Sequence, residues 1–203
     1  MMTTPSPSGM NIMVDIETIG TSLDAMILAI GAVRFNPFSK DRAISTTEGS
    51  FRWVADLRCP QAGANYDLQT IAWWMVKTEE EARQRMFSPT VANRSVFAGH
   101  IKHGLEEFQK WIAASPTAIV WAYGPEFDIT VLNRAFENNM MAKQFERSNV
   151  RDYRTLRFVG NILRIPEPIF VGVEHDPLDD AFHYAGHAIT ILRKLAGCDP
   201  MEN

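Results

Sequence analysis

The sequence predicts an α/β fold, in which a mixed sheet of about five strands carries helices on both faces. Three β-rich segments follow one another at the start of the chain, and helical patterns then alternate with short apolar runs. The run at 117–123 is almost wholly apolar, which is typical of a central strand covered on both sides. At 203 residues, the chain is long enough for one domain with a substantial core.

The first three strands are expected at 11–16, 25–35 and within 44–57. The first is bounded by Thr18 and Gly20, and the second ends at Asn36 and Pro37. Consecutive strands without a helix between them pair most simply as antiparallel neighbours, so an antiparallel meander is predicted here.

Helices are expected next. The segment 67–87 has a helical pattern that breaks near Lys77 and Thr78, and the acidic residues 79–81 open its second part. The segment 95–114 has the clearest helical period and stops before Pro116. Its apolar residues are spaced by four, four, three and four positions: Phe97, Ile101, Leu105, Phe108 and Ile112.

The second half of the chain predicts an alternation of strands and helices. The expected elements, in order, are a strand at 117–123, a turn at Gly124 and Pro125, a helix at 127–138, a strand at 145–150, a helix from Asp152 capped by its side chain, a loop at 165–176, and a last helix from near Pro177 to Leu195 that ends at Gly197.

Composition limits the class of protein. Residues 1–9 are expected to form a flexible tail and residues 10–203 a single domain; no stretch approaches the roughly 18 apolar residues of a membrane span. Cys59 and Cys198 are far apart, which argues against a disulfide framework or zinc site and favours a reducing cytoplasm. The net charge of -4 gives no overall attraction to nucleic acid, so metal ions or a local basic patch would have to hold a polyanion.

Asp15 and Glu17 are the first candidate functional residues. Side chains at i and i+2 of a strand point the same way, so the two carboxylates would lie side by side at the end of a buried strand. Their repulsion is costly unless a cation lies between them, and Mg²⁺ or Mn²⁺ suits such oxygen ligands. A polar turn is the alternative, and the tripeptide alone favours it.

Two further acidic positions follow. Asp128 lies just past the predicted central strand, where ligands gather in α/β sheets, although an acid in a first helical turn also complements the helix dipole. His175 is expected on the loop, and Asp176 is expected to cap the last helix. Asp179 and Asp180 point about 100° apart on that helix, so only one can face the sheet.

Together these motifs resemble the three exonuclease motifs of the DEDDh (DnaQ-like) family, which has the ribonuclease H-like fold. The motifs are Asp-Ile-Glu-Thr at 15–18, Phe-Asp at 127–128, and a histidine at 175 followed five positions later by an aspartate. The paired tryptophans at 73–74, Gly124 and the 175–180 segment are most similar to the branch of RNase AS-type exoribonucleases and phage exonuclease A.

The resemblance implies a 3'-to-5' exonuclease that releases nucleoside 5'-monophosphates from single strands. Asp15, Glu17, Asp128 and Asp180 would bind two ions of Mg²⁺ or Mn²⁺, and His175 would be the general base. RNA is expected over DNA from the resemblance alone. The alternatives are a single-stranded DNA exonuclease and a non-catalytic nucleic-acid-binding relative. The resemblance is also compatible with a homodimer.

Residues of a second tier are expected to contact the substrate: Thr18, Ile19, Leu23, Trp73 and Phe127. Trp73 and Trp74 could stack on a base, or one could belong to the core and the other to an interface. His183 and His187 have metal-ligand spacing, but packing or exposure is the preferred interpretation. Between residues 143 and 164, six basic residues face two acidic ones, which makes this segment a candidate phosphate track or a solvated or subunit-facing surface.

Overall fold

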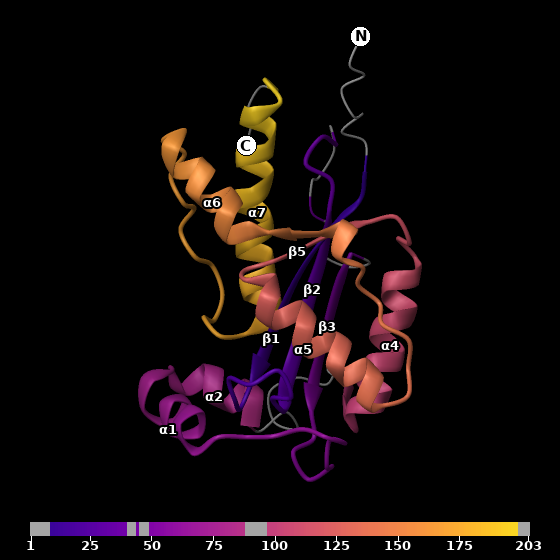
Figure 1. Cartoon of the computed structure of the whole chain (residues 1–203). Coiled ribbons are helices and arrows are strands. Elements are labelled where there is room, and N and C mark those ends of the chain that lie inside the picture. The colour runs from indigo at the N-terminus through magenta and orange to yellow at the C-terminus, as the bar shows by residue number, and fades with distance from the viewer. Residues whose placement is uncertain (1–8, 40–43, 45–48, 88–96, 199–203) are drawn as a thin grey trace.

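The computed structural model describes residues 9–39, 44, 49–87 and 97–198. Their strands form one six-stranded sheet in the order β4-β3-β2-β1-β5-β6 (Figure 1). The strands are β1 (Asn11–Thr18), β2 (Ile27–Phe35), β3 (Ser50–Ala55), β4 (Phe97–Gly99), β5 (Ile119–Ala122) and β6 (Val150–Asp152). The expected tail at 1–9 lies outside the described residues except for Gly9.

The helices cover both faces of this sheet, as predicted (Figure 1). They are α1 (Leu68–Lys77), α2 (Glu80–Phe87), α4 (Ile101–Ala113), α5 (Pro125–Asn138), α6 (Tyr153–Ile162) and α7 (Pro177–Leu195), with a short 3₁₀ helix, η1 (Arg147–Asn149). One core cluster joins the sheet to α4 and α5, and a second joins it to α6 and α7. No helix in the described ranges is long and apolar enough to cross a bilayer.

The sheet is mixed. β1, β2 and β3 pair antiparallel, which confirms the predicted meander. β4 runs parallel to β3, β5 parallel to β1, and β6 parallel to β5. β1 is therefore a central strand with an antiparallel neighbour on one side and a parallel one on the other.

The alternation of side chains along β1 decides where its carboxylates point. Ile12, Val14 and Ile16 pack into the cluster under α4 and α5. Met13 packs into the opposite cluster, against α7. Because odd-numbered residues share a face, Asp15 and Glu17 lie on the α7 side of the sheet.

The prediction of a helix at 95–114 is wrong for its first residues. Residues 97–99 form β4, and α4 begins at Ile101. His100 caps α4 through its ring Nδ1, which accepts a hydrogen bond from the Lys102 amide at 3.2 Å. The apolar spacing at Phe97 fits a helical period, but the backbone of this short segment instead pairs with the neighbouring strand β3. Residues 95 and 96 lie outside the described residues.

The strand expected at 145–150 is also displaced, to Val150–Asp152. The Phe145 carbonyl accepts a hydrogen bond from Asn133 Nδ2 at 3.0 Å, and the Phe145 amide donates to Asn133 Oδ1 at 3.3 Å. A side chain of α5 thus satisfies the backbone groups that a strand partner would otherwise pair. Asp152 caps α6, as predicted, by accepting from the Arg154 amide.

Gly31 on β2 allows the first turn of α7 to reach the sheet. Gly31 pairs directly opposite Asp15, so the two positions share a face. A Cβ at residue 31 would lie 2.1 Å from the backbone carbonyl carbon of Pro177. The absence of a side chain therefore lets the start of α7 lie against the strand, close to the carboxylates of β1.

We expect Gly31→Ala to destabilise the protein by about 1–3 kcal/mol, because the added methyl group must push α7 off the sheet. Gly186→Ala, on α7 itself, is the matched control. A Cβ at residue 186 would meet no atom of another element within 4 Å, and alanine in a helix is about 1 kcal/mol better than glycine. Urea unfolding of both variants tests the contact. A Gly31→Ala protein as stable as wild type would show that α7 does not need this close approach.

Candidate active site

The carboxyl end of β1 holds two acidic side chains in the interior. Asp15 and Glu17 are both only partly accessible, and both face α7. β1 extends beyond β5 at this end, because the pairing with β5 covers Asn11–Met13. The backbone of β1 beyond Met13 is therefore free to bind side chains from other elements.

Asp128 uses this free backbone. Its Oδ1 accepts a hydrogen bond from the Ile16 amide at 3.2 Å, and the residue is only 5% exposed. The local sequence produces this placement, because Gly124 turns the chain with a φ of 90° and Pro125 starts α5 immediately after it. Asp128 is then one turn into the helix and faces β1.

His175 and Asp180 come from the other face of the sheet. Asp176 caps α7 by accepting from the Leu178 amide at 3.1 Å, which puts Asp180 one turn inside the helix. Asp180 Oδ2 accepts from the His175 amide at 3.1 Å. Ligand atoms of Glu17, His175 and Asp180 all lie within 4.8 Å of one another. The His175 Nδ1 is 3.7 Å from Glu17 Oε1, which is longer than a hydrogen bond.

Burial and mutual repulsion make these acids unusually weak. Burial is the largest cause of the raised pKa of Asp15, followed by the charges of Asp128, Glu17 and Asp180. Burial also raises the pKa of Glu17. It raises the pKa of Asp128 to about 7 and, with the Glu17 charge, that of Asp180 to about 7. The Glu17 carboxylate raises the pKa of His175.

The donor set fits a hard divalent cation. In the part of the chain that the structure describes, no lysine or arginine pairs with Asp15, Glu17, Asp128 or Asp180. Four carboxylates gathered in the interior without a basic partner are electrostatically unfavourable. Oxygen ligands of this kind are the ones that Mg²⁺ and Mn²⁺ prefer, and bound cations would remove the repulsion.

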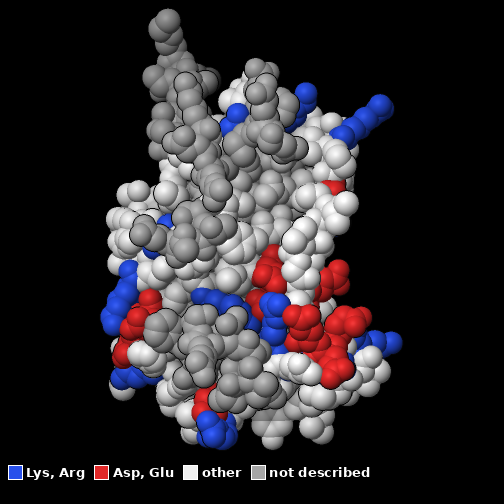
Figure 2. All heavy atoms as spheres, turned by 180° about the vertical axis from the view of Figure 1, so that it is seen from behind, with Lys and Arg blue, Asp and Glu red and all other residues white. Residues whose placement is uncertain are grey.

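Two arginines hold the loop that carries His175. Arg52 of β3 and Arg85 of α2 both pair with the Asp176 carboxylate, at 2.8 Å and 3.0 Å. Arg85 also pairs with Asp179 at 3.0 Å, and Asp179 Oδ2 accepts from the Val173 amide at 2.9 Å. Because of these two contacts, the carboxylate of Asp179 supports the loop and does not point at the acidic cluster. On the face opposite to that of Figure 1, acidic side chains gather beside basic ones near the end that carries α1 and α2 (Figure 2).

We expect Asp179→Asn to lower turnover less than about tenfold, because the amide oxygen can still accept from Val173 and only the ion pair to Arg85 is lost. Asp180→Asn, the matched change one residue later, should remove nearly all turnover. Steady-state hydrolysis of a single strand by both variants tests the distinction. Equal losses would show that the choice of Asp180 as the facing residue is wrong.

The expected substrate-contacting residues are placed unevenly. Thr18 is buried, and its carbonyl accepts from Trp74 Nε1 at 2.9 Å. Ile19 is also buried, packed in a cluster with Trp74, so it offers little surface to a base. Trp73 is 41% exposed and presents its ring to His175 edge to face, with 5.0 Å between ring centroids. One tryptophan thus belongs to the core and the other lies beside His175.

The other two expected contact residues lie in the turn between β1 and β2 and in the first turn of α5. Leu23 is half exposed. Phe127 is partly buried against the core under α4 and α5. Its neighbour Asp128 points to β1, so the two side chains contact different parts of the protein.

Some residues near the site were not foreseen. Burial and then the charge of Asp15 raise the pKa of Tyr184, which lies one turn after Asp180 on α7. The i to i+4 spacing was the available signal. Arg52 and Arg85 left no such signal. His187 is buried with its Nδ1 2.8 Å from the Tyr153 hydroxyl, and His183 lies 3.4 Å from Glu167, so both take part in packing.

The family described as the 3'-5' exoribonuclease Rv2179c-like domain matches residues 10–192. The chain belongs to this family. No curated protein matches the sequence. As a member of this family, the chain is a 3'-5' exonuclease, and its ribonuclease H-like fold agrees with that activity.

Solved structures of DEDDh exonucleases share the fold. The nuclease domain of 3'hExo, a DEDDh family member bound to rAMP, has 13% identity and a TM-score of 0.58, with 96% of each chain covered. E. coli exonuclease I in complex with a 5cy-dA13 oligonucleotide has 12% identity and a TM-score of 0.61, with 92% of this chain and 41% of that chain covered. At these identities the comparison supports the fold, and the individual residues must be argued from their geometry.

Proposed function

We propose that the protein hydrolyses single-stranded RNA from its 3' end to nucleoside 5'-monophosphates, with two divalent ions and His175 as the general base. The observation that carries this proposal is the convergence of four acidic side chains, two buried and two partly accessible, from β1, α5 and α7, with one histidine beside them. The end of β1 and the starts of α5 and α7 bring these side chains to one place. Together they form a site of high negative charge.

Asp15, Glu17, Asp128 and Asp180 would hold the cations. Glu17, which faces both His175 and Asp180, would bridge the base and the metal site. When bound, the divalent ions supply the positive charge that activates water and stabilises the leaving 3' oxygen. Metal charge on Glu17 would also reduce the pull of its carboxylate on the His175 proton, which favours the neutral imidazole that a base requires.

His175 would take the proton from the attacking water. As the new bond from water to phosphorus forms, the bond to the 3' oxygen breaks, and that oxygen leaves as the new 3'-hydroxyl after protonation by solvent. The left-handed backbone of His175, with a φ of 68°, turns its ring toward Glu17. Trp73 and Trp74 both contact the ring at their edges and limit its orientation.

The preference for RNA rests on the family description, which names an exoribonuclease. The fold itself does not discriminate, because one structural neighbour is bound to rAMP and another to a DNA oligonucleotide. Discrimination requires a contact with the 2'-hydroxyl. Single-stranded DNA is therefore the second candidate substrate.

Matched RNA and DNA oligonucleotides, labelled at the 5' or at the 3' end, test the proposal directly. With Mg²⁺ or Mn²⁺, we expect a ladder from the 5'-labelled RNA and immediate release of a labelled mononucleotide from the 3'-labelled RNA. Chelator should stop both. Faster hydrolysis of DNA would reverse the assignment of the sugar, and no hydrolysis with any divalent ion would favour a binding protein without turnover.

Three broader expectations belong to the same proposal. Residues 10–203 are proposed to fold as one domain, a homodimer is proposed from the family resemblance, and the free thiols of Cys59 and Cys198 are compatible with a reducing cytoplasm. Sedimentation velocity at several protein concentrations tests the oligomeric state. A single monomeric species at micromolar concentration would remove the homodimer.

A further inference from the structure

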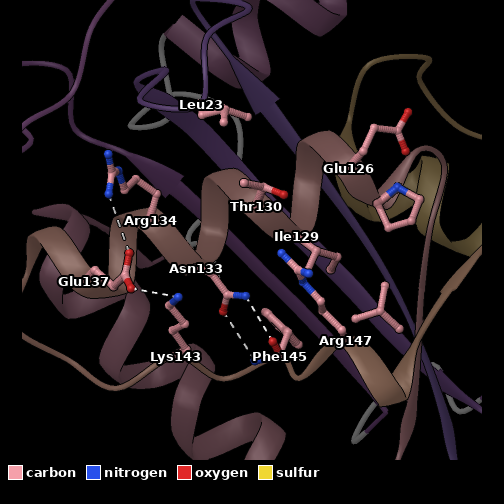
Figure 3. Close-up of a pocket in the computed structure, with 12 residues that line it drawn as sticks. Leu23, Glu126, Ile129, Thr130, Asn133, Arg134, Glu137, Lys143, Phe145 and Arg147 are labelled. Carbon is pink, nitrogen blue, oxygen red and sulfur yellow. Dashed lines mark hydrogen bonds and ion pairs between the residues drawn. The ribbon is translucent and has the colours of Figure 1, made fainter.

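A groove of about 530 Å³ runs between α5 and the segment 143–150 (Figure 3). At one end it is lined by Glu126, in the first turn of the helix that carries Asp128, and Leu23 lies at its side near Thr130 (Figure 3). At the other end it is lined by Glu137 and Lys143. The helix rises about 1.5 Å per residue, so the groove extends about 18 Å from the start of α5.

The second wall of the groove is fixed to α5. Asn133 pairs with both backbone groups of Phe145 and also accepts from the Gln144 amide at 3.3 Å. These bonds hold the segment after α5 at a set distance from the helix. The groove is therefore preformed, with an apolar floor that includes Ile129, Phe145 and Val150.

Most charged side chains on the rim of the groove form ion pairs with other described residues, and one arginine does not. Glu137 pairs with Lys143 at 3.0 Å and lies 3.8 Å from Arg134, while Glu126 pairs with Arg154 at 3.0 Å. Arg134 pairs in addition with Asp24 at 2.8 Å. Arg147 differs from these residues, because its guanidinium has no hydrogen bond or ion pair to any residue within the described ranges. In Figure 3 it lies over the groove beside Ile129.

We propose that this groove binds the upstream nucleotides of the same single strand whose 3' end enters the candidate active site. The inference rests on the proposed function. A nucleic acid strand alternates apolar base faces with anionic phosphates, and the groove offers an apolar floor with one unpaired guanidinium above it. The strand would run along α5, with bases against the half-exposed Leu23 and the partly exposed Val150 and a phosphate against Arg147.

The position of the groove supports this occupant. Glu126, which lines the groove, and Asp128, which belongs to the acidic cluster, both lie in the first turn of α5, so one end of the groove lies next to the cluster. Of the basic segment 143–164, which was a candidate phosphate track or a solvated or subunit-facing surface, Lys143 and Arg147 line the groove, whereas Arg157 pairs with Glu167 at 2.6 Å.

The length dependence of hydrolysis tests the groove. For wild type, we expect KM to fall as the substrate is lengthened from two to about ten nucleotides, while kcat stays constant. Arg147→Gln should raise KM for the ten-nucleotide strand about three- to tenfold and leave KM for the dinucleotide unchanged. Loss of one phosphate contact should also reduce the slope of log affinity against log salt by about 0.7.

Arg58→Gln is the matched control. Arg58 is 83% exposed, and among the described residues it pairs only with nearby Asp56. It does not line the groove, yet its replacement changes the net charge equally. It should leave KM at every length as in wild type. An equal rise in KM for both variants would show a general charge effect and would overturn the groove proposal.

Failure of this proposal can be separated from failure of the proposed function. If wild type hydrolyses strands but Arg147→Gln changes neither the length dependence nor the salt slope, the groove is not the track and the exonuclease assignment stands. If no strand is hydrolysed, fluorescence anisotropy with labelled ten-nucleotide RNA still decides the matter. Weaker binding by Arg147→Gln than by Arg58→Gln would support the groove, and equal binding would reject it.

Discussion

Asp15→Asn is expected to reduce turnover about a thousandfold or more while raising the stability of the metal-free protein. The carboxylate is buried among three other acids, so its loss removes a metal ligand and relieves repulsion at the same time. Metal-dependent charge stabilisation contributes several kcal/mol to such reactions, and each 1.36 kcal/mol is a factor of ten in rate. A surface acid replaced in the same way would change neither quantity.

The pH dependence of stability follows from the same repulsion. Asp128 and Asp180 have pKa values of about 7 in the folded protein, against 3.8 as the ordinary value. The folded protein therefore holds protons that the unfolded chain has released, so the free energy of unfolding should fall as pH rises from about 4 to about 7. Divalent ions bound by these carboxylates should reverse most of that loss.

Thermal unfolding in chelator and in Mg²⁺, across this pH range, measures both effects. Asp15→Asn should melt a few degrees higher than wild type in chelator near pH 7 and should gain less from Mg²⁺. Glu80→Gln, on the exposed start of α2, is the control and should melt as wild type does under each condition. A wild-type protein that Mg²⁺ does not stabilise would contradict the assignment of these acids as ligands.

His175→Ala is expected to lower kcat by about 10²–10⁴, the range typical for loss of a general base. The His175 ring faces the carboxylates of Glu17 and Asp180 from a loop, where it can reach a water in the site without being needed to hold the cations. Metal affinity should therefore change little. Free imidazole added to the variant should restore part of the activity.

Titration of Mg²⁺ against the melting temperature and against rate separates the two roles of His175. His103→Ala, at an exposed position on α4, is the control and should behave as wild type. A parallel fall in kcat and in metal affinity for His175→Ala would assign the ring as a metal ligand, because the three ligand atoms lie within 4.8 Å of one another. A variant with full activity would exclude His175 as the base.

Local chemistry in the sequence was enough to predict the elements that carry the acids. Pro177, with Asp176 before it, marked the start of α7, and Gly197 marked its end, so the predicted bounds agree with Pro177–Leu195. The i to i+2 spacing of Asp15 and Glu17 put them on one face of β1, and Gly124 with Pro125 predicted the start of α5. These signals depend on neighbours along the chain.

Where neighbours along the chain were ambiguous, the predictions were wrong or incomplete. The helical spacing of Phe97 could not reveal that β3 leaves an edge for β4. The strand expected at 145–150 was displaced because Asn133, twelve residues away, takes the backbone of Phe145. Pairing with distant backbone groups is a property of the assembled sheet, and no local pattern encodes it.

The sequence by itself determined which residues are chemically able to form a metal-dependent nuclease site and on which elements they lie. Only the tertiary structure decided that Arg52 and Arg85, 124 and 91 residues from Asp176, hold the loop of His175. It likewise decided that Ile19 is packed into the core while Leu23 lies open on a groove. Helix caps and strand periodicity act over a few residues, whereas burial, ion pairs and grooves arise only when remote segments are brought together.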